Sequence, residues 1–136
     1  MNYDLIVSFD GGCHPNPGGR ATWGVVVRNS LGQTVLESSG AIAPGRTSNN
    51  VAEYVAARMA LEAIMEVAAK GWRVLLMGDS QIVVGKLNRP GRVSKGLCME
   101  ACVAAQEQYQ RAKRAGIVVD VQWVRREQNM EADALT

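Results

Sequence analysis

The sequence predicts an α/β fold in which a mixed five-stranded sheet, three antiparallel strands followed by parallel crossovers, is flanked by helices. The order of the segments carries this prediction, because three strand-like segments come first and strands then alternate with helical segments. The chain has 136 residues, of which 47% are hydrophobic and 21% charged, as expected for one globular domain with its own core. We therefore expect residues 1–136 to form a single domain, with a final helix that is short or truncated.

Each element has a local cause. Apolar runs and period-two patterns predict strands, glycines end the long helices, and Ser, Thr or Asn side chains begin them. Strands are expected at residues 4–10, 21–28, 34–42, 73–77 and 117–124. Helices are expected from the capping segment 47–50 to about residue 70, from residue 80 to the loop 88–96, at residues 97–115, and after Asn129.

Composition excludes several classes of protein. No apolar run is long enough for a membrane span, and the polar start MNYD does not fit a secretory signal. Three cysteines without metal-ligand spacing predict reduced thiols in the cytoplasm, and we expect a monomer without a membrane partner. The net charge of +2 does not identify a partner by itself. The tryptophans are interpreted as core aromatics: Trp23, Trp72 and Trp123.

One stretch of the chain is locally basic. Between Asp79 and Glu100 there are four cationic side chains and no acidic one: Lys86, Arg89, Arg92 and Lys95. Such a run is either a nucleic-acid contact or a solvated loop, and the sequence leaves both open.

Two aspartates follow apolar strands. Asp10 closes the first strand before two glycines, and Asp79 closes the fourth. A turn-forming Asp-Gly and a helix N-cap are the alternative interpretations. Because sites in α/β sheets gather at the carboxyl ends of strands, the repetition of the arrangement favours a shared site.

Glu53 lies on the wrong face of its helix for a solvated glutamate. The charged stripe of that helix runs through Arg58, Glu62 and Glu66, whereas Glu53 aligns with Ala57 and Ile64 on the face that must pack on the sheet. An inward carboxylate needs a cation or a proton, although the helix N-terminus alone offers some stabilisation.

A fourth acidic residue comes from the end of the chain. Both Glu131 and Asp133 fall in the first turn after Asn129, and spacing does not choose between them. Four converging carboxylates would repel one another unless divalent cations lay among them, and oxygen-only ligands suit Mg²⁺ or Mn²⁺. Two such ions about 4 Å apart would activate water and stabilise the leaving oxygen in phosphodiester hydrolysis.

The chain resembles the type 1 ribonucleases H in four segments that occur in the family's order. These segments are FDGGCHPNPGGRATWG, RTSNNVAEYVAARMAL, LLMGDSQIVV and WVRREQNMEADAL. The resemblance implies a ribonuclease H-like fold and an endonuclease that cuts the RNA strand of RNA–DNA hybrids with two Mg²⁺ ions, Mn²⁺ being a possible substitute. It implies four metal-binding catalytic carboxylates, and so prefers Asp133 to Glu131: Asp10, Glu53, Asp79 and Asp133.

The resemblance also implies a surface for the hybrid. Its minor-groove residues would be Gly11, Cys13, Asn16, Asn49 and Asn50, since amides and backbone groups can read a 2′-hydroxyl. Arg46 and Ser48 match a pocket for a phosphate of the DNA strand. Helix capping is the alternative role for Asn49 and Asn50, and simple burial is the alternative for Cys13.

Two departures from the family and three rival functions complete the interpretation. The long basic protrusion of some members is absent, and so is the family's catalytic histidine, because His14 lies in the first loop and is expected to be a bystander. The rivals are a transposase- or resolvase-like nuclease, a non-catalytic hybrid-binding module and a Mg²⁺-dependent phosphatase. The hybrid-contacting asparagines disfavour the first, the full set of carboxylates disfavours the second, and Gly12 stands where the third would need an acid.

Overall fold

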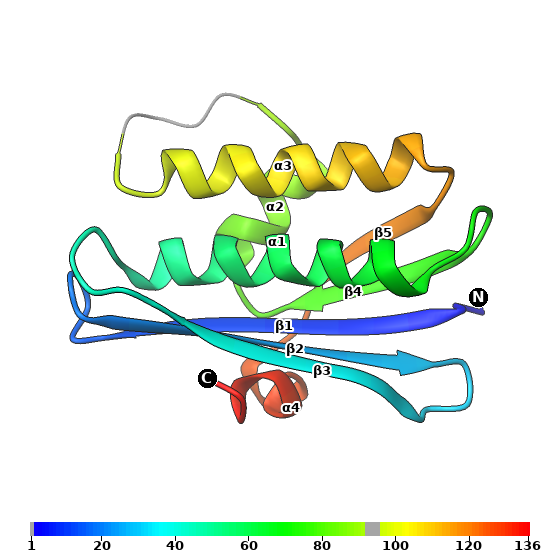
Figure 1. Cartoon of the computed structure of the whole chain (residues 1–136), viewed down its shortest axis with the longest axis horizontal. Helices are drawn as coiled ribbons and strands as arrows, with labels where there is room; N and C mark the ends of the chain where they lie inside the picture. Colours follow the sequence, from blue (N-terminus) through cyan, green and yellow to red (C-terminus); the bar gives the residue numbers. More distant parts are fainter. Residues whose placement is uncertain (1, 92–95) are drawn as a thin grey trace.

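The fold is a twisted five-stranded sheet with helices on both faces (Figure 1). A computed structural model describes residues 2–91 and 96–136. The strands lie in the order β3-β2-β1-β4-β5. Their bounds are β1 Leu5–His14, β2 Arg20–Asn29, β3 Thr34–Ile42, β4 Arg73–Gly78 and β5 Val118–Trp123. The pairs β1–β2 and β2–β3 are antiparallel, and β1–β4 and β4–β5 are parallel. The predicted mixed sheet is thus confirmed.

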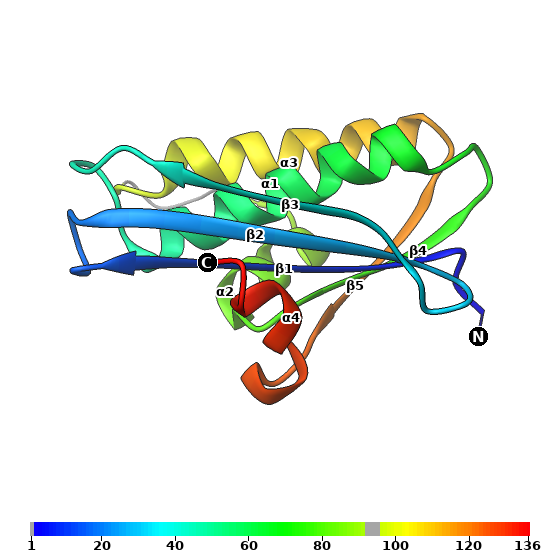
Figure 2. The same ribbon diagram turned by 60° about the horizontal axis from the view of Figure 1, so that its bottom comes forward.

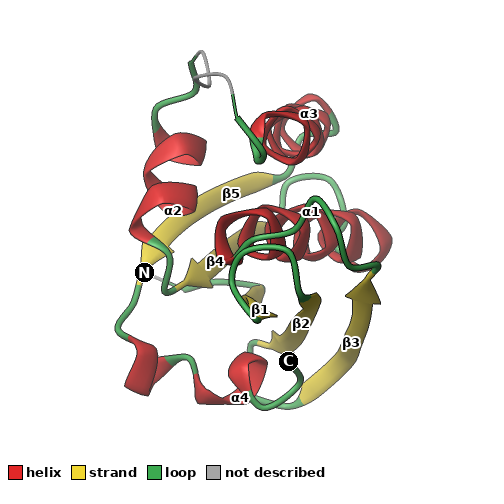
Figure 3. Cartoon of the chain, turned by 90° about the vertical axis from the view of Figure 1, so that its left-hand side faces the viewer, coloured by secondary structure: helices red, strands yellow, loops and turns green. Residues whose placement is uncertain are grey.

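In the described part of the chain, four α-helices and one 3₁₀ turn cover this sheet. Their bounds are α1 Asn49–Val67, α2 Gln81–Asn88, α3 Met99–Arg114, η1 Arg126–Gln128 and α4 Met130–Asp133. Helices α1 and α3 lie on one face, and the short α4 lies on the other (Figures 1 and 2). Viewed along the strands, α4 lies on the side of β1 and β2 opposite to α1 (Figure 3).

The core forms where β1 meets α1. Leu5, Val7 and Phe9 alternate along β1 and are each at most 1% exposed, as the period of two dictates for the face toward α1. On α1, Ala57 and Ile64 are fully buried, which confirms the predicted packing face. Side chains at even positions of β1 therefore point to the opposite face, and Asp10 is one of them.

Several predicted boundaries move. Helix α1 ends at Val67 rather than near residue 70, because Ala68 is already extended. Strand β1 runs on to His14 instead of ending at Asp10, since antiparallel pairing with β2 continues from Asp10–Gly24 to His14–Arg20. The prediction that Asp10 is the last residue of its strand was therefore wrong for the pairing with β2. The parallel pairing with β4 does stop at Phe9–Gly78, one residue before Asp10.

The tryptophans differ from one another. Trp23 and Trp72 are partly buried and pack against the core, whereas Trp123 is 40% exposed and donates its ring N–H to the Asp79 carbonyl oxygen at 3.0 Å. The interpretation of Trp123 as a core aromatic was wrong, because it is the last residue of an edge strand. All three cysteines are free thiols.

Two further expectations concern particular segments. Of the basic run, Arg92 and Lys95 lie outside the described residues, while Lys86 lies in the last turn of α2. Across the part of the chain that is described, none of the helices combines the length and the apolar character that a membrane crossing requires.

Candidate active site

The two strand-end aspartates are neighbours because β1 and β4 are parallel. Their pairing ends at Phe9–Gly78, so Asp10 and Asp79 each follow the last paired residue. Asp79 does not cap α2, because the Ser80 hydroxyl accepts from the Val83 N–H at 3.3 Å and holds the N-cap position. The carboxylate of Asp79 is therefore left for the site.

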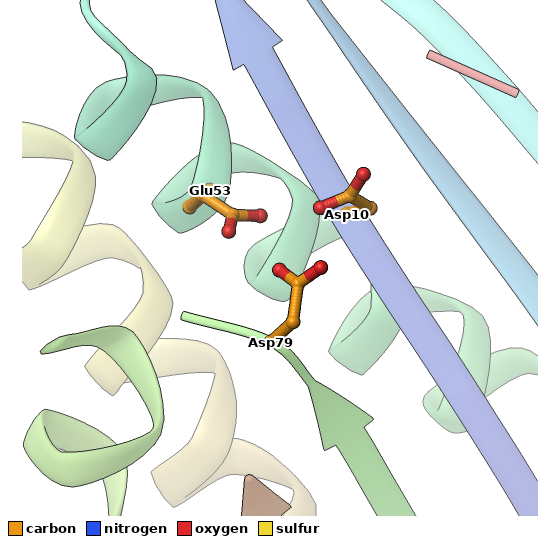
Figure 4. A group of neighbouring side chains, drawn as sticks. All are labelled: Asp10, Glu53 and Asp79. Atoms are coloured by element: carbon orange, nitrogen blue, oxygen red, sulfur yellow. The ribbon is translucent and has the colours of Figure 1, made fainter. Parts of the chain in front are cut away.

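Glu53 reaches the same point from α1 (Figure 4). Its Oε1 accepts a hydrogen bond from the Gly11 N–H at 2.7 Å, and the residue is 8% exposed. This approach requires glycine at position 11, since a Cβ there would lie 2.3 Å from the Ala52 carbonyl oxygen. Oxygens of Asp10, Glu53 and Asp79 lie within 4.8 Å of one another.

Crowding and burial make these carboxyl groups hold protons tightly. Burial is the largest cause that raises the pKa of Asp10 to about 8, followed by a hydrogen bond with Asp133 and by the charge of Asp79. Burial, and then the charges of Asp10 and Asp79, raise the pKa of Glu53 to about 9, against the lowering effect of the Gly11 N–H. Without cations, Asp10 and Glu53 therefore keep their protons at neutral pH, and ionising both is electrostatically unfavourable.

Helix α4 places the two C-terminal acids in different surroundings. Arg28 on β2 binds the exposed Glu131 through two nitrogens and holds it away from the cluster. Asp133 lines the same hollow as the three other carboxylates and contributes to the raised pKa of Asp10. Asp133 also lies 3.9 Å from an Arg126 nitrogen.

Two contacts seat α4 so that Asp133 faces Asp10. Asn129 occupies the N-cap position, but its side chain makes no cap bond; its amide donates instead to the Phe9 carbonyl oxygen at 2.9 Å. Asn129 therefore stands at the expected N-cap position, but the expected side-chain bond to the helix is absent. Gly24 allows the close packing, because a Cβ there would lie 2.6 Å from both the Ala132 oxygen and the Leu135 Cβ.

The donor set fits a hard divalent cation. All the contributing atoms are carboxylate oxygens, which suit Mg²⁺ or Mn²⁺ and not zinc. A bound cation would replace the protons that burial now favours, so the raised pKa values and the ligand chemistry point to the same occupant.

Comparison with known proteins decides the family. The family described as reverse transcriptase-like matches residues 8–136. The crystal structure of RNase H1 from the halophilic archaeon Halobacterium salinarum aligns with a TM-score of 0.79 and 32% identity over 96% of this chain and 92% of that chain. The chain belongs to the type 1 ribonuclease H family.

Two more relatives are similar to this chain over nearly its whole length. LC11-RNase H1, solved in complex with an RNA/DNA hybrid, aligns with a TM-score of 0.79 and 29% identity over 96% of this chain and 92% of that chain. The "Bifunctional protein Rv2228c" of Mycobacterium tuberculosis is 34% identical over 132 residues, which is 96% of this chain and 34% of that protein. The chain thus spans about a third of the length of the curated relatives it matches first.

The ribonuclease H resemblance also named a hybrid-binding surface, and several of its residues form one network. The Asn49 side-chain oxygen accepts from the Cys13 N–H at 2.9 Å, and the Asn16 side-chain oxygen accepts from the Asn49 N–H at 3.0 Å. The network joins the end of β1 to the start of α1. Asn16, Asn49 and Asn50 are all exposed, and Asn49 and Asn50 line the hollow of the carboxylates.

Capping belongs to another residue of this network. The Ser48 hydroxyl accepts from the Val51 N–H at 3.1 Å and is the N-cap of α1, so the alternative of capping by Asn49 or Asn50 was wrong. Cys13 is 1% exposed, and its thiol faces the carbonyl oxygens of Pro15 and Gly19 at 3.3 and 3.6 Å. Its side chain is therefore buried, as the simpler interpretation had it.

Sequence reasoning missed how much of the site is made by neutral residues. Thr22, Ser80 and Thr136 line the hollow, and nothing in their local sequence marks them. Thr22 is found only through the register of β2 on β1, which places it opposite Gly12. Arg126, in contrast, could be found from the sequence, because it lies in the segment where the family places a histidine.

Proposed function

We propose that this domain is an endonuclease that hydrolyses the RNA strand of RNA–DNA hybrids. The observation that carries the proposal is the convergence of the buried Asp10 and Glu53 with the half-buried Asp79 where the parallel pairing of β1 and β4 ends, with Asp133 in the same hollow. Membership of the type 1 ribonuclease H family supports the same activity. As the chain spans a third of the first curated relatives, the activity is proposed for the domain.

The four carboxylates are proposed to hold two Mg²⁺ ions, with Mn²⁺ as a substitute. Such ions, when bound, supply an activated water and stabilise the leaving oxygen of the phosphodiester. The protein supplies rigid placement: Asp10 and Asp79 through strand pairing, Glu53 through the Gly11 N–H, and Asp133 through the seating of α4. Arg126, close to Asp133, is placed to attract the scissile phosphate into this negative hollow.

Discrimination between RNA and DNA is proposed to rest on the exposed amides. Asn49 and Asn50 line the hollow of the carboxylates, and Asn16 accepts from the Asn49 N–H. An amide can both donate to and accept from a 2′-hydroxyl. Gly11 and Cys13 would contribute backbone groups only. Arg46 is exposed in the loop before α1, close in sequence to Ser48, where it is proposed to bind a phosphate of the DNA strand.

The wider setting is also a proposal. We take the chain to act as a single domain and a monomer in the cytoplasm, since its free thiols suit a reducing compartment.

A panel of labelled duplexes tests the proposed function. The protein is incubated with RNA–DNA, RNA–RNA and DNA–DNA duplexes in Mg²⁺, and products are resolved by length. We expect internal cuts in the RNA strand of the hybrid alone. Asn16→Ala should weaken hybrid binding by about 1 kcal/mol, a typical loss for one polar contact. Comparable cleavage of the all-DNA duplex would refute the assignment.

A further inference from the structure

The hollow of the carboxylates extends along β1 and β2 beyond the carboxylates themselves, as far as His14. On the face of the sheet away from α1, β1 and β2 place three residue pairs in a row: Asp10–Gly24, Gly12–Thr22 and His14–Arg20. At about 3.3 Å per residue, His14 lies about 13 Å along the strand from Asp10. Only a glycine and a threonine lie between them, so the floor of this row is low.

A second hollow continues the first along this row. It is lined by Arg20, Ser39, Gly40, Ala41 and Leu135, and it shares His14, Thr22 and Thr136 with the hollow of the carboxylates. The end of the chain after α4 forms one wall, because Leu135 packs over Gly24. The two hollows together make a groove that begins at Asp10 and ends at the His14–Arg20 pair.

The two ends of this groove have opposite charge. None of the described residues that line the second hollow is acidic, and both His14 and Arg20 are exposed. Within the described ranges 2–91 and 96–136, no hydrogen bond or ion pair engages the side chain of either residue. A guanidinium is charged at any working pH and matches a phosphate, to which an imidazole N–H can also donate.

We propose that His14 and Arg20 form a subsite for a backbone phosphate of the strand that is cut, a few nucleotides from the scissile bond. The proposal rests on the proposed function. One strand of a duplex carries about one phosphate per 3.4 Å of axis, so the groove spans a few nucleotides. A strand whose scissile phosphate lies at the carboxylates would follow the groove and meet the cationic pair. The Arg46–Ser48 pocket, proposed for the other strand, lies in a different loop.

This subsite has a specific kinetic signature. His14 and Arg20 are positioned to bind, not to react, so their loss should act on substrate capture and leave the turnover rate at saturation intact. Loss of one cationic contact to a phosphate reduces the slope of log affinity against log[salt] by about one unit. The matched control is Arg114→Gln, which removes another exposed arginine, on α3 and remote from the groove.

The experiment compares wild type, the double variant His14→Gln/Arg20→Gln and Arg114→Gln on an RNA–DNA hybrid. We expect kcat/KM of the double variant to fall roughly fivefold at low salt and its slope against log[salt] to drop by about 1, with kcat within about twofold. Arg114→Gln should match wild type. A double variant whose slope equals that of Arg114→Gln would overturn the subsite.

A second arm identifies the strand. Single uncharged methylphosphonate linkages are placed at successive positions of the RNA strand or of the DNA strand. Wild type should lose kcat/KM at one RNA-strand position a few nucleotides from the cut, and the double variant should be insensitive there. If the double variant instead lost the wild-type sensitivity to a methylphosphonate at a DNA-strand position, the assignment to the cut strand would be overturned. Wild-type protein that cuts no hybrid would refute the proposed function itself, an outcome that differs from both.

Discussion

The two ends of the parallel strands β1, β4 and β5 place carboxylates in opposite surroundings. Toward the amino ends, Asp120 of β5 accepts from the Tyr3 hydroxyl at 2.9 Å and lies 3.4 Å from an Arg73 nitrogen, and Asp4 accepts from the Arg73 N–H at 2.8 Å. At the carboxyl ends, Asp10, Glu53 and Asp79 face one another (Figure 4). A paired carboxylate contributes to structure, whereas a cluster of buried like charges opposes folding and is retained for ligand binding.

The largest expected effect is a difference in hydrolysis rate between substitutions at the two ends of the strands. Asp10→Asn keeps the shape of the side chain but removes a charge that the cations require, so hybrid hydrolysis should fall by orders of magnitude. Asp120→Asn, the matched change at the other end, should leave the rate within about twofold and lower stability by about 0–1 kcal/mol, as for an exposed pair. Rates on labelled hybrid in Mg²⁺ and thermal melts measure both. Near-normal cleavage by Asp10→Asn would show that the site is assigned to the wrong end.

The second prediction repeats the contrast within α4. Asp133 faces Asp10, whereas Glu131 is bound by Arg28. Asp133→Asn should reduce turnover by about 100-fold or more, and Glu131→Gln should change it by less than about threefold. Single-turnover rates at saturating protein measure the difference. Equal losses in the two variants would mean that the seating of α4, and not the Asp133 carboxylate, is what matters.

The third prediction concerns the cations beside the site. Arg126→Ala should lower turnover by about tenfold, because a guanidinium close to Asp133 is lost from the hollow. His14→Ala should leave turnover at saturation within a few-fold, since His14 binds the strand at a distance from the carboxylates. The kcat values of the two variants decide this. A hundred-fold fall for His14→Ala with binding intact would make His14 a catalytic group.

The smallest effect is on stability against pH. The folded-state pKa values of Asp10 and Glu53, about 8 and 9, lie above their ordinary values, so folding takes up protons between about pH 4 and those values. Their stabilising contribution is present below about pH 4 and is lost as pH rises through 8 to 9. Metal-free protein should therefore melt lower at pH 8 than at pH 5.5, and Asp10→Asn should reduce that difference by roughly 5 °C.

Mg²⁺ should reverse this trend. The cation binds the deprotonated carboxylates, so its stabilisation should grow with pH and should be absent in Asp10→Asn. Asp120→Asn serves as the control, because its neighbours include a cation already. A melting temperature of metal-free wild type that rises steadily from pH 5.5 to 8 would contradict the expected loss of stability with pH.

Much of the fold could be predicted because it depends on local pattern. The alternation of Leu5, Val7 and Phe9 indicates a strand with one buried face, and the position of Glu53 on the apolar face of α1 indicates a functional carboxylate. The boundaries were less predictable. β1 outlasts its apolar run because β2 supplies hydrogen bonds up to His14–Arg20, and this pairing partner lies in another segment of the chain.

The sequence by itself thus determined the order of elements, the inward Glu53 and the two aspartates after apolar strands, because each depends on periodicity within one segment. Only the tertiary structure placed Asp133 in the hollow and Glu131 outside it, since Glu131 is bound by Arg28, which is distant in sequence. It also showed that, within the capping segment 47–50, Ser48 caps α1 and Asn49 binds the Cys13 N–H, and it joined His14 and Arg20 to the groove. These outcomes depend on contacts between segments, which no local pattern encodes.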